Sequence, residues 1–298
     1  MKKILLTIIF IFSALLLISC SKSGSETTNG ISITDDLGNK FVFDKKPERI
    51  ITLAPNLTEM IYSLGLQKHL IGNTLYCNYP EDAKRIEKVG DMLTYDFEKI
   101  ITLKPDLLFI SVEGNTKETY DKFRGLGLKI FVSNPRNYQG IKKTYLDFGK
   151  IFGVEKTAED QIAKWDSVIN FISASSKNNS KKSAALMVEA SPIMLAGEST
   201  FFSEFFEICG IKNIASGIKM NYPVFSREEL LKQNPDYIFY PTALDDKLER
   251  VVNIYPEWKR LKSINNKNFF LVDRDLYSRP GPRFAEAVLD IFNRLHRD

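Results

Sequence analysis

The sequence holds few side chains of the kinds that carry out covalent chemistry. Only two histidines are present, His69 in a polar segment and His296 near the end of the chain. A Ser-His-Asp or Cys-His site would need one of them, and no G-x-S-x-G nucleophile elbow occurs. Phosphate-binding glycine patterns are absent, as are the clustered histidines typical of zinc or manganese sites. These absences favour a binding protein over an enzyme.

Cys20 is the residue with the clearest chemical role. Two lysines precede an uncharged, mostly apolar run over residues 4–18, which is short for a membrane span and typical of a signal-peptide core. The run ends in Leu-Ile-Ser-Cys, which resembles the lipobox of bacterial lipoproteins. We therefore expect a signal peptide over residues 1–19, a lipid on Cys20 and a flexible polar tether over residues 20–30. An ordinary secretory signal with an incidental cysteine is the alternative.

The rest of the composition argues against nucleic acid as a partner and against a further membrane span, and it leaves one question about the cysteines open. Removal of residues 1–19 lowers the formal net charge from +4 to +2, which gives no reason to expect binding to nucleic acid. No later stretch is apolar enough to span a membrane. Cys77 and Cys209 remain after Cys20. In an exported protein they could form a disulfide, and two buried thiols are the alternative.

Apolar runs typical of buried strands alternate with helical patterns along the chain, which predicts α/β lobes with mainly parallel sheets. The expected strands lie at 49–53, 107–110, 129–132, 184–188, 237–240 and 269–272. The expected helices lie at 57–64, 97–103, 116–126, 201–209, 227–233 and 283–295.

The chain also contains a weak repeat. Residues 96–109 can be laid over residues 226–239, because each stretch reads as a capped short helix, a Pro-Asp stop and an apolar strand. Residues 58–65 echo residues 203–210 in the same order. We therefore expect an N-terminal lobe over 31–153 and a C-terminal lobe over 179–298.

Between the two expected lobes, an amphipathic helix is predicted over 154–178, with a capping box formed by Thr157 and Asp160. Such a helix would be a strut with little hinge freedom. An ordinary helix that packs on one lobe is the alternative.

The ordered pieces resemble a known family from about residue 35 to the end of the chain. It is the family of substrate-binding proteins of ABC importers for cobalamin, haem and ferric siderophores. The matching pieces lie at 47–59, at 98–100 with 104–107, at 197–198 with 210–214, at 226–228 with 234–236, and at 279–283. The resemblance implies two Rossmann-like lobes joined by a single long helix, the class III periplasmic-binding-protein fold. It also implies a monomer with no catalytic activity and no cofactor besides the transported ligand.

The resemblance is densest to the cobalamin-binding members and implies a ligand cleft between the lobes. Its residues would be Tyr76 and Met92 from the first lobe, and Met194, Tyr222, Asp275, Tyr277 and Arg279 from the second. Tyrosine rings and methionine thioethers would cover the faces of a macrocycle, and Asp275 and Arg279 would bind its polar rim. The sequence departs from the family pattern at Met92, Tyr222 and Met194, where cobalamin-binding members carry aromatic residues, tryptophan at the first two. Surface tyrosines, core methionines and an Asp275–Arg279 ion pair are the alternatives.

Glu98 and Glu228 occupy equivalent positions in the repeat, in the first turn of each short helix. A carboxylate there interacts favourably with the helix dipole, which is one explanation for both. The resemblance implies another, in which each glutamate meets arginines on one half of the permease dimer.

The function expected from these observations is that of a corrinoid receptor, exported and held at the periplasmic or cell-surface face of a membrane. A haem receptor, with Tyr222, Met194 or Cys77 as conceivable iron ligands, and a ferric-siderophore receptor are alternatives within the family. A partner-binding lipoprotein without a small ligand and an exported enzyme are alternatives of other classes.

Overall fold

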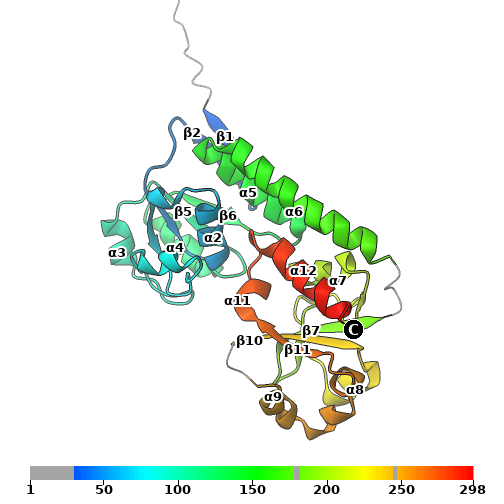
Figure 1. The fold of residues 1–298 in the computed structure, drawn as a ribbon. Helices are drawn as coiled ribbons and strands as arrows, with labels where there is room; N and C mark the ends of the chain where they lie inside the picture. Colours follow the sequence, from blue (N-terminus) through cyan, green and yellow to red (C-terminus); the bar gives the residue numbers. More distant parts are fainter. Residues whose placement is uncertain (1–29, 178–181, 244–246, 298) are drawn as a thin grey trace, which may run out of the picture.

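The computed structural model describes residues 30–177, 182–243 and 247–297. The predicted signal peptide, Cys20 and the tether up to residue 29 lie outside these ranges. Figure 1 shows two lobes on the same side of one long helix, which runs along both. The mixed α/β architecture and the long joining helix confirm the predicted fold class.

The N-terminal lobe is built on a four-stranded parallel sheet in the order β4-β3-β5-β6. Its strands are β3 (Ile50–Thr52), β4 (Leu70–Asn73), β5 (Leu107–Ser111) and β6 (Ile130–Ser133). Its helices are α2 (Pro55–Ser63), α3 (Phe97–Thr102), α4 (Lys117–Gly125) and α5 (Tyr138–Phe152), with 3-10 turns η1 (Gln67–His69) and η2 (Glu81–Arg85). An antiparallel ribbon of β1 (Ile31–Thr34) and β2 (Lys40–Phe43) precedes them. Every residue of β3, β5 and β6 is buried, as expected for strands covered on both faces.

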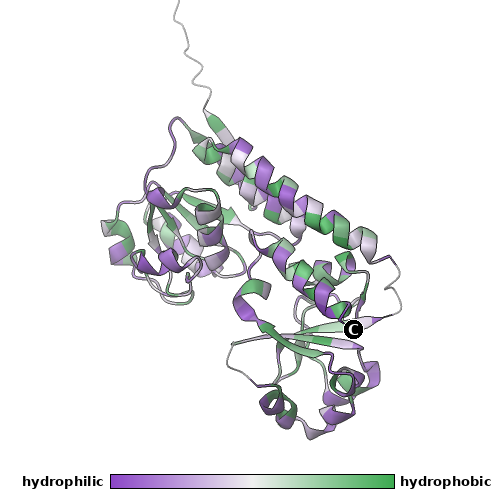
Figure 2. Ribbon diagram, in the orientation of Figure 1, coloured by the Kyte–Doolittle hydropathy of each residue, from purple (hydrophilic) through white to green (hydrophobic). Residues whose placement is uncertain are grey.

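The C-terminal lobe repeats this plan with one antiparallel edge. Its sheet has the order β11-β10-β7-β8, with β9 also paired to β7, and only the β7–β8 pair is antiparallel. The strands are β7 (Ser183–Glu189), β8 (Met194–Leu195), β9 (Lys212–Asn213), β10 (Tyr237–Thr242) and β11 (Phe269–Asp273). The helices are α7 (Phe201–Ile208), α8 (Arg227–Gln233), α9 (Leu248–Ile254), α10 (Lys262–Asn265), α11 (Arg274–Tyr277) and α12 (Phe284–Leu295), with a 3-10 turn η3 (Pro256–Arg260). Figure 2 shows green, apolar stretches within the sheet of this lobe.

The repeat read from the sequence has a structural counterpart in each lobe. Lys104 and Asn234, at matching positions after α3 and α8, both adopt positive φ, of 49° and 42°. This left-handed turn lets a Pro-Asp pair follow each helix. The Asp106 carboxylate then accepts the backbone N–H groups of residues 48 and 49, just before β3, at 2.8 and 2.9 Å. Asp236 accepts the backbone N–H of Ser183, at the start of β7, at 2.9 Å. Each aspartate therefore ties the start of one strand to the start of its neighbour.

The long helix α6 (Glu155–Ser175) packs against helices of both lobes. Gly153, with φ of 62°, ends α5 in the left-handed conformation and permits the sharp turn into α6. The buried face of α6 recurs at helical spacing, at Ala158, Ile162, Trp165, Ile169 and Ile172. Trp165 contacts Tyr145 of α5, with ring centroids 4.7 Å apart. Since α6 also packs on α12, it braces the two lobes as a strut.

The capping box predicted for α6 is wrong. The helix begins at Glu155, after Val154, without a side-chain cap. Thr157 therefore lies inside the first turn, and Asp160 forms an ion pair of 2.6 Å with Lys156, one turn earlier on the helix.

Cys77 and Cys209 are both buried and do not form a disulfide. Cys77 lies in the N-terminal lobe, where the Thr58 hydroxyl donates to its sulfur at 3.1 Å. Cys209 follows α7 in the C-terminal lobe, and burial raises the pKa of its thiol to about 12. The alternative of two buried thiols is the one that the structure supports.

Ellman's reagent is therefore expected to leave both thiols of a Cys20→Ser form of the native protein unlabelled over minutes. Burial excludes the reagent, and the raised pKa of Cys209 suppresses its reactive thiolate. In urea, both thiols should react. Fast labelling of the native protein would contradict the buried positions, and an absence of labelling in urea would reveal a disulfide.

Candidate ligand cleft

Segments that follow strands of both sheets meet around one cavity of about 240 Å³. They follow β3, β4 and β5 in the N-terminal lobe and β11 in the C-terminal lobe. Ligands of open α/β sheets bind in such places, outside the carboxyl ends of the strands. The lining includes four of the seven residues predicted to bind ligand, namely Tyr76, Met92, Asp275 and Arg279.

Met92 is presented to this cavity by a tight turn. The Asp91 carboxylate accepts the backbone N–H groups of Leu93 and Thr94 at 2.7 and 2.6 Å, and these bonds lower the pKa of Asp91. Gly114 leaves the space that the Met92 methyl group occupies, since a Cβ at position 114 would lie 2.2 Å from it. The N-terminal lobe therefore holds a methionine at the cleft on a braced loop, beside the exposed ring of Tyr76.

Arg279 also borders the cavity, but its guanidinium is already heavily engaged. It donates to Glu59 and to Asn78 at 2.8 Å each, and to the carbonyl oxygen of Tyr76 at 3.1 Å. It also forms an ion pair of 2.8 Å with Asp275. This ion pair was the alternative to ligand binding that the sequence left open for these two residues. Arg279 is thus a connector between the lobes that also fixes the backbone at Tyr76.

Glu59 is the centre of this connection. Its side chain, on α2, is 1% exposed. Arg283 approaches both of its carboxylate oxygens at 2.8 Å, and Arg279 approaches one of them at the same distance. Two arginines of the C-terminal lobe therefore share one buried carboxylate of the N-terminal lobe. Sequence reasoning did not single out Glu59, although it lies in the segment that echoes residues 203–210.

The repeat places a second glutamate at the lobe junction. Glu204, which aligns with Glu59, accepts the backbone N–H of Tyr138 from the N-terminal lobe. Burial raises the pKa of Glu204. The Tyr138 ring stacks on Phe284 of α12 at 5.2 Å. Each lobe therefore receives a contact from the other at equivalent points on α2 and α7.

The prediction that Tyr277 faces the ligand is wrong. Its side chain is fully buried, its ring packs on Phe205 at 5.9 Å, and its hydroxyl donates to Asp290 of α12 at 2.7 Å. Burial and the Asp290 carboxylate raise its pKa far above the usual value. Tyr277 is a core residue, because the four-residue helix α11 turns it inward.

Tyr222 and Met194 lie outside the lining of the cavity, although Tyr222 reaches its edge. The Tyr222 hydroxyl donates at 3.2 Å to Glu113, which lines the cavity from the other lobe. Met194 lies on β8 and pairs with Val224, two residues beyond Tyr222. Both side chains are half-buried.

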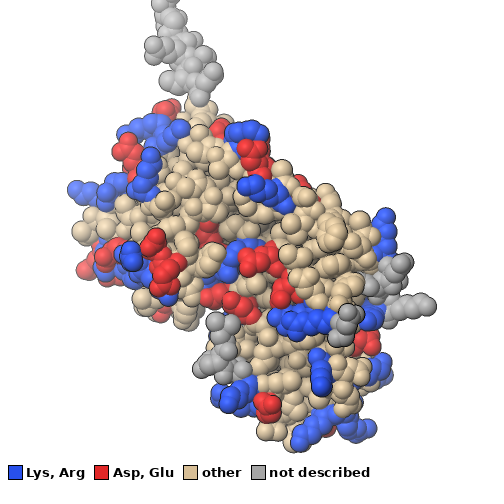
Figure 3. Space-filling model, viewed as in Figure 1, with Lys and Arg blue, Asp and Glu red and all other residues tan. Residues whose placement is uncertain are grey.

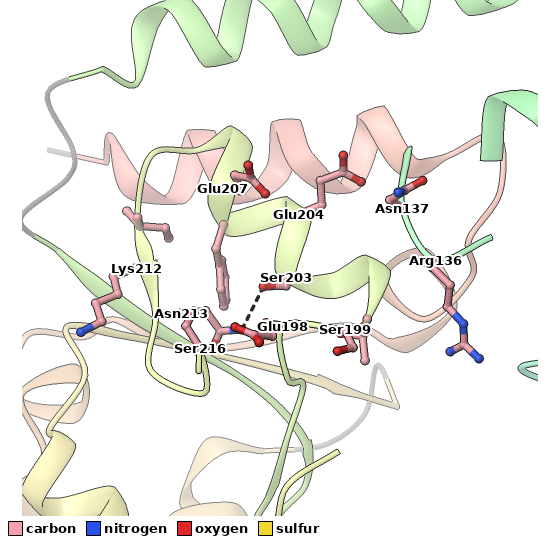
Figure 4. A pocket seen from close by; sticks show the side chains of 13 residues that line it. Arg136, Asn137, Glu198, Ser199, Ser203, Glu204, Glu207, Lys212, Asn213 and Ser216 are labelled. Carbon is pink, nitrogen blue, oxygen red and sulfur yellow. Dashed lines mark hydrogen bonds between the residues drawn. The ribbon is translucent and has the colours of Figure 1, made fainter. Parts of the chain in front are cut away.

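A larger cavity of about 620 Å³ lies elsewhere, between residues 136–137 and α7. Figure 4 shows its polar lining, with Glu204 and Glu207 on α7 and a 3.3 Å hydrogen bond from Asn213 to Ser203. None of the residues predicted to bind ligand lines it. The smaller cavity remains the better candidate, because both lobes contribute the ends of their strands to it.

Glu98 and Glu228 are both exposed in the first turns of α3 and α8, one on each lobe. Hydrogen bonds from the backbone N–H of Glu228 and from the Ser226 hydroxyl lower the pKa of Glu228. Charges of both signs are spread over the face in Figure 3, and acidic side chains gather where the lobes meet.

Comparison with known proteins agrees with this architecture. The model of the family described as periplasmic binding protein matches residues 50–276. An uncharacterized ABC transporter substrate-binding lipoprotein of Bacillus subtilis, YvrC, is 30% identical, over 89% of this chain and 85% of its own length. A vitamin B12-binding protein of Vibrio vulnificus is 28% identical, over 81% of this chain and 87% of its own. The crystal structure of the periplasmic vitamin B12 binding protein BtuF of Vibrio cholerae superposes with a TM-score of 0.72 at 26% identity, covering 84% and 97% of the two chains.

No helix among residues 30–177, 182–243 and 247–297 has the length and apolar character needed to cross a bilayer. Proteins of the matched family are transport components that bind solutes, not enzymes. On the match over residues 50–276 and the similarity to relatives along most of its length, the chain belongs to the periplasmic binding protein family.

Proposed function

We propose that the chain is the receptor of an ABC importer and carries cobalamin or a related corrinoid in the cleft between its lobes. The observation that carries this proposal is the cavity at the strand ends, which Tyr76 and Met92 border from one lobe and Asp275 from the other. The vitamin B12-binding relatives support the choice of ligand.

The size of the cavity bears on how such a ligand would be held. Its 240 Å³ lies below the roughly 300–1,000 Å³ of typical ligand pockets, so a corrinoid would lie across the mouth of the cleft. Exposed apolar side chains flank the predicted ligand residues on both lobes, where they would cover the faces of a macrocycle. They are Leu75 and Leu93, beside Tyr76 and Met92, and Met220 and Val224, on either side of Tyr222.

Two further parts of the proposal concern delivery. A lipid on Cys20 would hold the receptor near its membrane, and residues 21–30 would form a flexible tether between the lipid and the lobes. Glu98 and Glu228, exposed on separate lobes, would each pair with arginines on one half of the permease dimer. One carboxylate per lobe would align the cleft with the translocation path.

The test of the ligand is retention after desalting. The purified protein is incubated separately with cyanocobalamin, haemin and a panel of ferric siderophores, passed through a desalting column, and examined by absorption spectroscopy. We expect one equivalent of cyanocobalamin to be retained. Retention of haemin or a siderophore instead would replace the corrinoid with that ligand. Retention of none would favour a lipoprotein that binds a partner protein.

The strut α6 makes a further prediction about motion. Since α6 packs on α5 and α12, and Glu59 ties the lobes together, ligand binding should change their arrangement little. Small-angle scattering of the free and cyanocobalamin-bound protein is expected to give nearly equal radii of gyration. A large contraction on binding would contradict the role of α6 as a strut.

A further inference from the structure

Two side chains that line the cleft cavity are without partners among the described residues, one of them buried and polar and the other charged. Ser111, at the end of β5, is 1% exposed, and its hydroxyl oxygen is buried without a hydrogen bond. Arg274, the first residue of α11, is exposed, and its guanidinium forms no ion pair or hydrogen bond in the described part of the chain. A buried hydroxyl without a partner is unfavourable, and most such groups in proteins are satisfied.

The other charged groups around the cavity are paired. Asp275 is bound by Arg279 and by the Asn78 amide, at 2.8 and 2.7 Å. Glu113 is bound by Arg136 and Tyr222. Among the charged and the buried side chains, the groups left for a ligand are therefore one guanidinium, which only donates hydrogen bonds, and one hydroxyl, which can donate. The exposed hydroxyls of Tyr76 and Ser278 also line the cavity.

The two groups are held on opposite sides of the cleft. The backbone N–H of Ser111 donates to the side-chain oxygen of Asn115 at 2.8 Å, and the Asn115 amide donates in turn to the carbonyl oxygen of Leu53 at 3.2 Å. On the other lobe, Asp273 caps α11 by accepting the backbone N–H groups of residues 275 and 276. A ligand group that meets both side chains would thus be gripped by both lobes.

We propose that Arg274 and Ser111 form a subsite for an anionic oxygen group of the ligand, a phosphate or a carboxylate. The inference rests on the proposed function and narrows its substrate class. An anion would supply the negative counter-charge that Arg274 lacks. Its oxygen atoms would also supply the hydrogen-bond acceptor that the Ser111 hydroxyl lacks. Among corrinoids, cobalamin carries a phosphodiester, whereas cobinamide does not. Haem would offer a carboxylate from its propionates.

Titration calorimetry of the wild-type protein and its variants with cyanocobalamin and with dicyanocobinamide separates these cases. The wild-type protein is expected to bind cyanocobalamin about ten-fold more tightly than dicyanocobinamide, which is the gain that one charge-assisted contact allows. Arg274→Gln should remove that preference by lowering the affinity for cyanocobalamin alone. Ser111→Ala should lower the affinity for cyanocobalamin about three-fold. Arg85→Gln, which changes an arginine exposed on η2, is the matched control and should bind like wild type.

Equal weakening of both corrinoids by Arg274→Gln, or no effect on either, would overturn the subsite while leaving the corrinoid receptor intact. If wild type binds haemin instead, the same comparison is made with haemin and its dimethyl ester, and Arg274→Gln must remove a preference for the free acid. If wild type binds none of these probes, the proposed function fails and the subsite fails with it.

Discussion

Replacement of Glu59 by glutamine is expected to lower the free energy of unfolding by about 3–5 kcal/mol, because it removes a buried carboxylate shared by two arginines. Arg279 keeps its ion pair with Asp275, whereas Arg283 loses its counter-ion. Arg279 and Arg283 are only 8% and 14% exposed at their side chains, so water cannot take over the role of the carboxylate. Glutamine keeps the shape of the side chain and one acceptor oxygen. The loss of stability therefore measures the effect of removing the negative charge.

Urea denaturation followed by circular dichroism measures this effect. The control is Glu98→Gln, which removes an exposed first-turn carboxylate and should cost no more than about 0.3–1 kcal/mol. A Glu59→Gln protein as stable as the control would contradict the structural role assigned to the buried cluster. The Glu59 variant should also bind ligand more weakly, because Arg279 holds the carbonyl oxygen of Tyr76.

Replacement of both Glu98 and Glu228 by alanine is expected to reduce uptake through the importer at least ten-fold while the affinity for ligand stays unchanged. Truncating one partner of a desolvated interfacial ion pair costs about 2–5 kcal/mol, and the double variant would remove two such pairs. Both side chains are exposed and absent from the lining of the cleft cavity, so their removal should not disturb the ligand.

The measurement pairs cellular uptake of labelled cyanocobalamin with calorimetry on the purified protein. Glu118→Ala, at an exposed first-turn position of α4, is the matched control and should transport normally. Each single variant should be impaired less than the double variant. A fall in affinity, or normal uptake by the double variant, would show that these glutamates do not dock the permease.

The local and periodic parts of this molecule could be predicted from its sequence. Buried strands, the capped helices α3 and α8 and the echo between the lobes all have signals within a few residues. Helix α5 carries such a signal too, although it is not among the helices expected above. Apolar residues that are all buried recur along it at spacings of three and four, at Tyr138, Ile141, Tyr145, Phe148 and Phe152.

The contacts that shape the cleft had no such local signal. Glu59 and Arg279 lie 220 residues apart in sequence, and no local feature near either residue predicts their contact. Tyr277 lies on a helix of four residues, which is too short for a periodic pattern to tell an inward from an outward ring. For α6, the Thr157 and Asp160 pattern is a valid capping signal, but the turn at Gly153 lets the helix begin earlier.

One ligand is expected to be held between the lobes at the ends of the strands. Hydrogen exchange measured by mass spectrometry, with and without cyanocobalamin, can locate it. We predict slower exchange in residues 74–78, 91–95 and 111–115 of the N-terminal lobe and in residues 274–280 of the C-terminal lobe, with little change around the cavity beside α7. Slowing confined to one lobe, or centred on α7, would contradict a ligand held between the lobes.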